Sequence, residues 1–189
     1  MELLKQIILR ESEVMSDQVL TLDSVLNQQI DPQLIMQLGR RFAELYSGEP
    51  ITKVVTIESS GISLGFSTAL ELNVPLVFAR RKQTLVSDPE TYSERVPSFT
   101  KGIVSDMLIP RKFLSSEDNV LIIDDIMANG DAVRGLIRII ERSGATLVGL
   151  GIAVEKSFQA GARTIREQGI RVESLVKIAS LEGGVIRFE

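Results

Sequence analysis

The chain has 189 residues, of which 44% are hydrophobic, and its 21 Lys plus Arg and 25 Asp plus Glu give a formal net charge of −4. This length suits one domain with a substantial core, and the acidic balance excludes the basic footprint of a protein that binds duplex nucleic acid. The sequence has no His and no Cys, which excludes Ser-His-Asp and thiol catalysis, imidazole or thiolate metal sites, and disulfides.

The apolar segments are too short to cross a membrane. The longest run, 147–154, has eight residues, whereas a spanning helix needs about 20. The start of the chain also lacks the basic, apolar and small-residue order of a secretory signal. We therefore expect a cytoplasmic protein that binds neither membranes nor nucleic acid.

The first 50 residues predict two helices. Helical spacing of apolar residues predicts the first over 2–12. A brief apolar segment, 19–22, then leads into 24–30, which has no clear period. Asp31-Pro32 combines an N-cap acceptor with a proline at the first helical position. A second helix is therefore expected from there to Gly48 and Pro50.

The next segments predict a βαβ unit, with a strand over 53–57, a turn over 58–61, a helix over 62–72 and a strand over 76–79. Residues 82–100 carry few apolar side chains. We expect them to form a long, mobile excursion that ends in a strand over 101–109. A loop of this length is usually either a functional lid or a disordered link.

The remaining segments continue the alternation of strands and helices. Strands are predicted over 120–123, 147–154 and 172–178, a loop over 124–130, and helices over 132–142 and 160–168. This order predicts an α/β fold with a mainly parallel, five-stranded sheet covered by helices on both faces. Ligands of such sheets bind beyond the carboxyl ends of the strands, which directs attention to the loops 58–61, 80–101, 124–131 and 155–158.

Two adjacent carboxylates, Asp124 and Asp125, follow the strand over 120–123. Like charges about 4 Å apart repel by about 4 kcal/mol near a protein surface, so the pair needs a cation or hydroxyl donors. Taken alone, it could equally be an acidic helix entry. The following Ala128-Asn129-Gly130 favours a ligand, because small residues let the backbone approach it and amides at a helix start bind phosphate. The segment therefore predicts a site for a sugar phosphate.

The segment 120–132 resembles the ribose-phosphate signature of the type I phosphoribosyltransferases. The turn 58–61 resembles the diphosphate loop of that family, and the segments 20–31, 55–62, 98–101 and 155–159 resemble its xanthine-specific bacterial members. The resemblance covers almost the whole chain. It implies a type I phosphoribosyltransferase fold in one domain, 1–189, with a small N-terminal hood over about 1–35 that covers the base.

The resemblance also implies a purine salvage reaction. Xanthine and 5-phospho-α-D-ribose 1-diphosphate, hereafter the donor, would give xanthosine 5′-monophosphate and diphosphate in a homodimer, with Mg²⁺ bound beside the donor and no organic cofactor. Two alternatives stay open. One is a hypoxanthine/guanine-specific member. The other is a non-catalytic purine-pathway regulator, which would need a nucleic-acid-binding module for which 189 residues leave no room.

The resemblance assigns the donor-binding residues by position. Asp124 and Asp125 would meet the ribose hydroxyls, directly or through Mg²⁺. The residues that would hold the 5-phosphate are Ala128, Asn129, Gly130, Asp131 and Ala132. The residues that would wrap the diphosphate are Glu58, Ser59, Ser60 and Gly61, with a cis peptide bond before Ser59. Further cationic help would come from Arg80, Arg81 and Lys82, and a lid contact from Lys101. The alternative interpretation of these last four is ordinary solvated surface charge.

Four residues are expected at the base. The resemblance assigns backbone contacts to Leu20, the discriminating amide to Asn27, a donor to Lys156 and an aromatic face to Phe158. Lys156 carries only donors, which suits the carbonyl oxygens of xanthine. Without the resemblance, Leu20 would be a core residue, Asn27 a turn residue and Phe158 a packing residue.

The chain departs from the family pattern in its phosphate loop. Asn129 and Ala132 stand where Thr hydroxyls are usual, and Asp131 places a carboxylate beside the expected phosphate unless it points outward. Ala128 stands where hypoxanthine/guanine members carry an Asp near the purine. Xanthine loses a ring proton more easily than other purines, so we expect it to enter already ionised.

Overall fold

The structure of the chain is a computed structural model that describes residues 1–82, 89–98 and 103–189. Its main sheet has eight strands in the order β10-β9-β8-β7-β3-β4-β6-β5. Five neighbouring strands run parallel, which confirms the expected sheet: β3 (Lys53–Ile57), β4 (Leu76–Lys82), β7 (Asn119–Met127), β8 (Thr146–Lys156) and β9 (Val172–Ser180). Three antiparallel strands extend its edges: β5 (Thr91–Ser98), β6 (Ile103–Pro110) and β10 (Arg187–Phe188).

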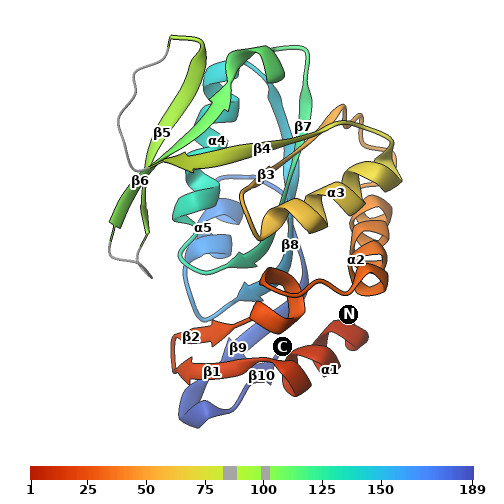
Figure 1. Cartoon of the computed structure of the whole chain (residues 1–189), viewed down its shortest axis with the longest axis vertical. Helices are drawn as coiled ribbons and strands as arrows, with labels where there is room; N and C mark the ends of the chain where they lie inside the picture. The colour runs from red at the N-terminus through yellow and green to blue at the C-terminus, as the bar shows by residue number, and fades with distance from the viewer. Residues whose placement is uncertain (83–88, 99–102) are drawn as a thin grey trace.

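Helices cover both faces of the parallel strands (Figure 1). One face carries α2 (Pro32–Leu45) and α3 (Gly61–Leu72), and the other carries α4 (Asp131–Ser143) and α5 (Gly161–Glu167). Alternate residues of β7 enter the two cores, with Leu121 and Ile123 on the α2 and α3 side and Val120 and Ile122 on the α4 and α5 side. Each helix pair thus seals one side of the strands that carry the candidate site.

The start of α2 follows the sequence signal. The Asp31 carboxylate accepts hydrogen bonds from the backbone N–H groups of Gln33, at 2.9 Å, and Leu34, at 3.3 Å, and Pro32 is the first helical residue. These bonds satisfy backbone donors that a helix start otherwise leaves unpaired. The buried Leu34, Leu38 and Phe42 then set the helix face that packs on the sheet.

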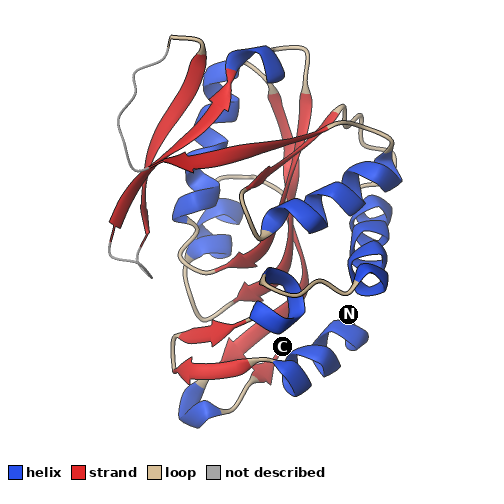
Figure 2. Ribbon diagram, viewed as in Figure 1, coloured by secondary structure: helices blue, strands red, loops and turns tan. Residues whose placement is uncertain are grey.

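The N-terminal elements lie at the carboxyl end of β8 and beside β9 (Figure 2). They are α1 (Glu2–Glu11), the antiparallel hairpin of β1 (Glu13–Ser16) and β2 (Val19–Thr21), and a π-helical turn, η1 (Asp23–Asn27). Two 3₁₀ turns, η2 (Arg111–Phe113) and η3 (Glu182–Gly184), complete the described chain. The Met1 amino group donates to the Leu175 carbonyl at 2.7 Å and Lys5 Nζ donates to the Glu189 carbonyl at 2.8 Å. These contacts bring the N-terminal helix beside the C-terminus.

The prediction of a long, mobile excursion over 82–100 is wrong for the described residues 91–98, because they form β5. This strand pairs with β6 over its whole length. Its buried residues, Tyr92 and Val96, lie on one face and pack in the core beneath α4. Two apolar residues at the two-residue period of a strand suffice for an edge strand with one buried face.

Strand β7 is longer than expected. It continues through Asp124 and Asp125 to Met127, so the acidic pair belongs to the strand and not to the loop after it. The short strands β1 and β10 were also not expected, because segments of four and two residues carry little periodicity. Within the described residues, no helix is both long and apolar enough to span a bilayer.

Candidate active site

A cavity of about 440 Å³ opens at the carboxyl ends of the parallel strands. Its walls come from β7, the loop after it and the start of α4, from the end of β8 and the loop after it, from single residues of β4 and β5, and from two residues of the β1–β2 hairpin. The lining residues are Gln18, Val19, Arg81, Pro97, Asp124, Ile126, Met127, Ala128, Asn129, Gly130, Asp131, Ala132, Val133, Lys156 and Gln159. The predicted phosphate loop and Lys156 therefore share one cavity.

The acidic pair is buried, with Asp124 6% and Asp125 4% exposed. Burial, and then the neighbouring charge of Asp125, raises the pKa of Asp124 well above its usual value. Burial also raises the pKa of Asp125, against a hydrogen bond with Ser60 that lowers it. Two buried carboxylates of this kind favour a nearby cation or hydroxyl donors. Asp124 lines the cavity, whereas Asp125 does not.

The carboxylate oxygens of the acidic pair are suitable ligands for a magnesium ion. Mg²⁺ in phosphoryl sites is usually held by one or two carboxylates together with substrate phosphates and water. Among the described residues, no group of three or more His, Cys, Asp or Glu side chains is placed to hold a metal by itself. The ion would therefore depend on phosphate oxygens as well as on Asp124 and Asp125.

The turn between β3 and α3 is held close to the acidic pair. The peptide bond between Glu58 and Ser59 is cis, as predicted. A Cβ at Gly61 would lie 2.0 Å from Thr56 Oγ1 and 3.0 Å from Asp124 Oδ1, so only glycine allows this approach. The Glu58 carboxylate accepts the backbone N–H of Arg81 at 2.8 Å, which ties the turn to β4. The predicted diphosphate loop thus lies beside Asp124.

Residues 128–130 join β7 to α4, so the predicted phosphate loop 128–132 includes the first two residues of the helix. Gly130 has a φ of 82° and α4 begins at Asp131. The first N–H groups of a helix have no acceptor within the helix, so they are available to an anion. The Ala128 carbonyl accepts the N–H of Gly161 at 3.2 Å. The Asp131 carboxylate accepts from Arg134 at 3.0 Å and is thereby paired with a cation.

The three basic residues at the end of β4 point to opposite faces of the strand. Arg81 lines the cavity, and its positive charge offsets part of the rise in the pKa of Asp124 that burial and Asp125 cause. Arg80 and Lys82 are exposed and do not line the cavity, because successive strand residues point to opposite faces. The Arg80 guanidinium lies 5.6 Å from the ring centre of Phe78. Diphosphate contacts by Arg80 and Lys82 stay predictions, and Lys101 lies outside the described residues.

At the other end of the cavity, Lys156 is only 7% exposed. Burial lowers the pKa of Lys156. Its Nζ donates to the Gln18 carbonyl at 2.7 Å, and Gln159 Nε2 donates to Gln18 Oε1 at 3.0 Å. Gln159 Oε1 is buried without a hydrogen-bond partner in the described chain. The two glutamines were not predicted, although Gln159 lies inside the segment 155–159.

The other predicted base residues do not line this cavity. Leu20 is buried in the core below the N-terminal elements, and Phe158 is half-buried against the same core. Asn27 is exposed, and its Nδ2 donates to Asp23 Oδ1 at 3.3 Å. The structure therefore brings Lys156 to the cavity, whereas base contacts by Leu20, Asn27 and Phe158 stay predictions.

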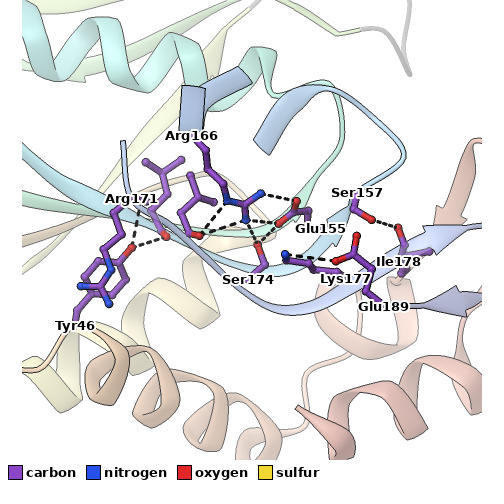
Figure 3. A network of polar contacts seen from close by, with 11 residues as sticks. Tyr46, Glu155, Ser157, Arg166, Arg171, Ser174, Lys177, Ile178 and Glu189 are labelled. Carbon is purple, nitrogen blue, oxygen red and sulfur yellow. Dashed lines mark hydrogen bonds and ion pairs between the residues drawn. The ribbon is translucent and has the colours of Figure 1, made fainter. Parts of the chain in front are cut away.

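The end of β8 is braced by an ion pair between the buried Glu155, next to Lys156 in the chain, and the partly exposed Arg166 (Figure 3). Glu155 accepts two hydrogen bonds from the Arg166 guanidinium, at 2.8 and 2.6 Å, and one from Ser174. Arg166 also donates to the Val172 carbonyl at 3.3 Å. Burial raises the pKa of Glu155, but the bonds from Arg166 and Ser174 outweigh it, so this pKa lies below its usual value. The pair joins β8, α5 and β9 beneath the cavity.

Comparisons with known proteins agree with this geometry. The family model described as a phosphoribosyl transferase domain matches residues 25–179. A protein of Moorella thermoacetica named xanthine phosphoribosyltransferase is 54% identical over 187 residues, which cover 99% of this chain and 95% of the relative. A protein of Bacillus licheniformis with the same name is 50% identical over 188 residues, covering 100% of this chain and 97% of the relative.

Solved structures show the same fold. An adenine phosphoribosyltransferase of Rhodothermus marinus superposes with a TM-score of 0.75 at 24% identity, covering 94% of this chain and 100% of that one. The corresponding enzyme of Thermoanaerobacter pseudethanolicus gives a TM-score of 0.75 at 20% identity, with 92% and 99% covered. From the matched family model and the full-length relatives, we conclude that the chain belongs to the phosphoribosyltransferase family.

Proposed function

We propose that the protein is a xanthine phosphoribosyltransferase of purine salvage, which converts xanthine and the donor into xanthosine 5′-monophosphate and diphosphate. One observation carries the proposal. Asp124 of the acidic pair, the phosphate loop 128–132 and the buried Lys156 line a single cavity. Full-length relatives at about half identity bear the name of this enzyme.

The donor would lie with its ribose near the acidic pair. The hydroxyls of the ribose would donate to Asp124 and Asp125, and the 5-phosphate would accept from the amides of 129–132. The diphosphate would extend toward Ser60 and Gly61, whose turn lies beside Asp124. A magnesium ion held by this pair and by the donor would offset the charge of the diphosphate.

The base would occupy the end of the cavity formed by Lys156 and Gln159. Xanthine presents carbonyl oxygens at carbons 2 and 6, whereas guanine has a donating amino group at carbon 2. The Lys156 ammonium offers donors only and so suits a carbonyl oxygen. Its buried position strengthens this preference, because an unmatched polar contact is costly there.

In the reaction, the bond from carbon 1 of the ribose to the diphosphate breaks and a bond from carbon 1 to a ring nitrogen of xanthine forms. The transition state would resemble a ribosyl oxocarbenium ion. The residues of the chain would contribute by holding both substrates in line and by placing negative charge, from Asp124 and Asp125, near the ribose. Xanthine would enter as its anion, because Ala128 offers no carboxylate to remove the ring proton.

The proposal extends to the organisation of the protein. Residues 1–189 would form one domain in which about 1–35 is the hood over the base. Its support is the bond from Lys156 to Gln18, which joins the β1–β2 hairpin to the cavity wall. The protein would act in the cytoplasm as a homodimer. The exposed Phe66 and Leu70 on α3 support an interface, and sedimentation of the wild type against Leu70→Glu would test it.

One assay distinguishes the proposal from its alternatives. The protein is mixed with donor, Mg²⁺ and each purine in turn, and diphosphate release is followed. Release with xanthine at a kcat/KM well above that for guanine and hypoxanthine is the expected result. A preference for guanine or hypoxanthine would indicate the other transferase, and donor binding without release would indicate a regulator.

A further inference from the structure

Arg134 makes an unusual set of contacts at the back of the phosphate loop. It lies in the first turn of α4, and its guanidinium donates to the Asn129 carbonyl, to Asp131 Oδ1 at 3.0 Å and to Thr164 Oγ1 at 3.3 Å. The side chains of Arg134 and Asp131 are 29% and 24% exposed. Arg134 does not line the cavity. One guanidinium thus joins the loop, the following helix and α5.

The partner of Arg134 on α5 completes a ring of contacts. Thr164 Oγ1 donates to the Gly161 carbonyl at 3.0 Å, and the Gly161 N–H donates to the Ala128 carbonyl at 3.2 Å. A Cβ at Gly161 would lie 2.2 Å from that carbonyl oxygen. The loop therefore packs closely against the start of α5. It is held there by the bond from Gly161 to Ala128 and, through Arg134, by the bond to Thr164.

These contacts engage the backbone carbonyl oxygens of the loop, which would otherwise repel an anion. The carbonyl of Ala128 accepts from Gly161, that of Asn129 from the Arg134 side chain, and that of Gly130 from the Arg134 backbone at 2.9 Å. Three successive carbonyl oxygens are thereby engaged by donors. The amides of the loop and of the first turn of α4 are the groups left for a phosphate.

The Asp131 carboxylate lines the cavity beside the amides proposed to hold the 5-phosphate, and Arg134 is its ion-pair partner. A carboxylate next to a bound phosphate would repel it by an amount that grows as water is excluded. Arg134 pairs with this carboxylate and leaves the loop without net charge. We propose that Arg134 is a positioning residue of the donor site, which neutralises Asp131 and fixes the phosphate loop 128–132 for the 5-phosphate. This inference rests on the proposed function and adds a residue that does not itself contact the substrates.

The test is a double-mutant cycle on donor binding. Wild type, Arg134→Gln, Asp131→Asn and the double variant are titrated with donor and Mg²⁺ by calorimetry, and the KM values for donor and xanthine are measured. Arg138→Gln is the matched control, because Arg138 lies one turn further along α4 and pairs with Glu94 at 2.6 Å. Urea unfolding checks that each variant is folded.

We expect Arg134→Gln to weaken donor binding about tenfold, with the KM for xanthine within about twofold of the wild-type value. The double variant is expected to recover most of the loss, because it carries no uncompensated carboxylate. Asp131→Asn alone should bind donor more tightly than the wild type, because the charge of Arg134 is then no longer compensated. Arg138→Gln should bind donor as the wild type does.

Two results would overturn the inference: wild-type donor binding by Arg134→Gln, or a loss in Arg134→Gln that the second substitution leaves undiminished. If Arg134→Gln does not fold, Asp131→Asn decides, because unchanged or weaker donor binding by that variant contradicts the neutralising role. Failure of the proposed function is distinguishable, since the wild type itself would then bind no donor or release no diphosphate.

Discussion

A methyl group at Gly161 would push against the phosphate loop. The added Cβ of Gly161→Ala would lie 2.2 Å from the Ala128 carbonyl oxygen and 2.8 Å from two further backbone atoms of the loop, whereas ordinary contacts begin at 3.4 Å. The clash involves backbone on both sides, so no side-chain rotation relieves it. The loop or the start of α5 must shift by about 1 Å, which typically costs about 1–3 kcal/mol of stability.

A shift of this size moves the amides that are proposed to hold the 5-phosphate. Misplacement by about 1 Å can cost a reaction about 100-fold. We therefore expect kcat/KM for the donor to fall about 100-fold, measured by diphosphate release with xanthine at saturation, with a smaller change in the KM for xanthine.

A matched control separates this effect from general destabilisation. Gly149→Ala creates a similar clash, 3.0 Å from the Arg171 carbonyl oxygen and 2.7 Å from Tyr46 Oη, near the start of β8 and away from the cavity. It is expected to lower the free energy of unfolding but to keep the wild-type kcat/KM in the folded fraction. Wild-type donor kinetics in Gly161→Ala, or equal losses in both variants, would refute the argument.

Three further predictions concern the cavity itself. Lys156→Met removes the charged group that we propose donates to the base, so the KM for xanthine should rise about 30-fold, while calorimetry finds donor affinity within about twofold of the wild type. Asp124→Asn should lower kcat and raise the urea midpoint at pH 7. Burial raises the pKa of Asp124 in the folded chain, so the charged form destabilises the fold at neutral pH. Ala128→Asp should give no gain in kcat for xanthine at neutral pH, because the base is expected to arrive ionised.

The outcomes that contradict these predictions are distinct. For Lys156→Met, the control is Lys177→Met, whose Nζ pairs with Glu189 at 3.5 Å, and equal effects in both variants would remove Lys156 from base recognition. For Asp124→Asn, the stability gain must shrink as the pH falls toward about 4, where the unfolded carboxyl also becomes neutral. A gain that persists there has another cause. A large rise in kcat in Ala128→Asp would mean that a general base is limiting.

Much of the fold follows from local signals in the sequence. The buried run Lys53–Ile57 forms β3 with the predicted ends, and the cap at Asp31 starts α2 as expected. The strand β5 was missed because its apolar signal consists of Tyr92 and Val96 alone, and it becomes stable only through pairing with β6 and packing beneath α4. Such a strand depends on partners that its own residues do not reveal.

For the site too, features with a contiguous sequence signal could be predicted, whereas features that depend on tertiary contacts could not. The position of the segment 128–132 at the cavity could be predicted, because its acidic strand end, small residues and helix start are contiguous in the sequence. Phosphate binding by this segment stays a prediction. Which of Arg80, Arg81 and Lys82 faces the cavity could not be predicted, because the strand was expected to end at Ala79. The face to which each later residue points depends on how far the strand continues. Contacts such as Lys156 to Gln18, and Arg134 to Thr164, join residues far apart in the chain and appear only in the folded structure.

A crystal structure of the protein with the donor and Mg²⁺ tests the central claim most directly. The claim predicts the 5-phosphate on the amides of 129–132 and the ribose hydroxyls within hydrogen-bond distance of Asp124 and Asp125. A donor bound outside this cavity, or bound there with its ribose away from both carboxylates, would contradict it.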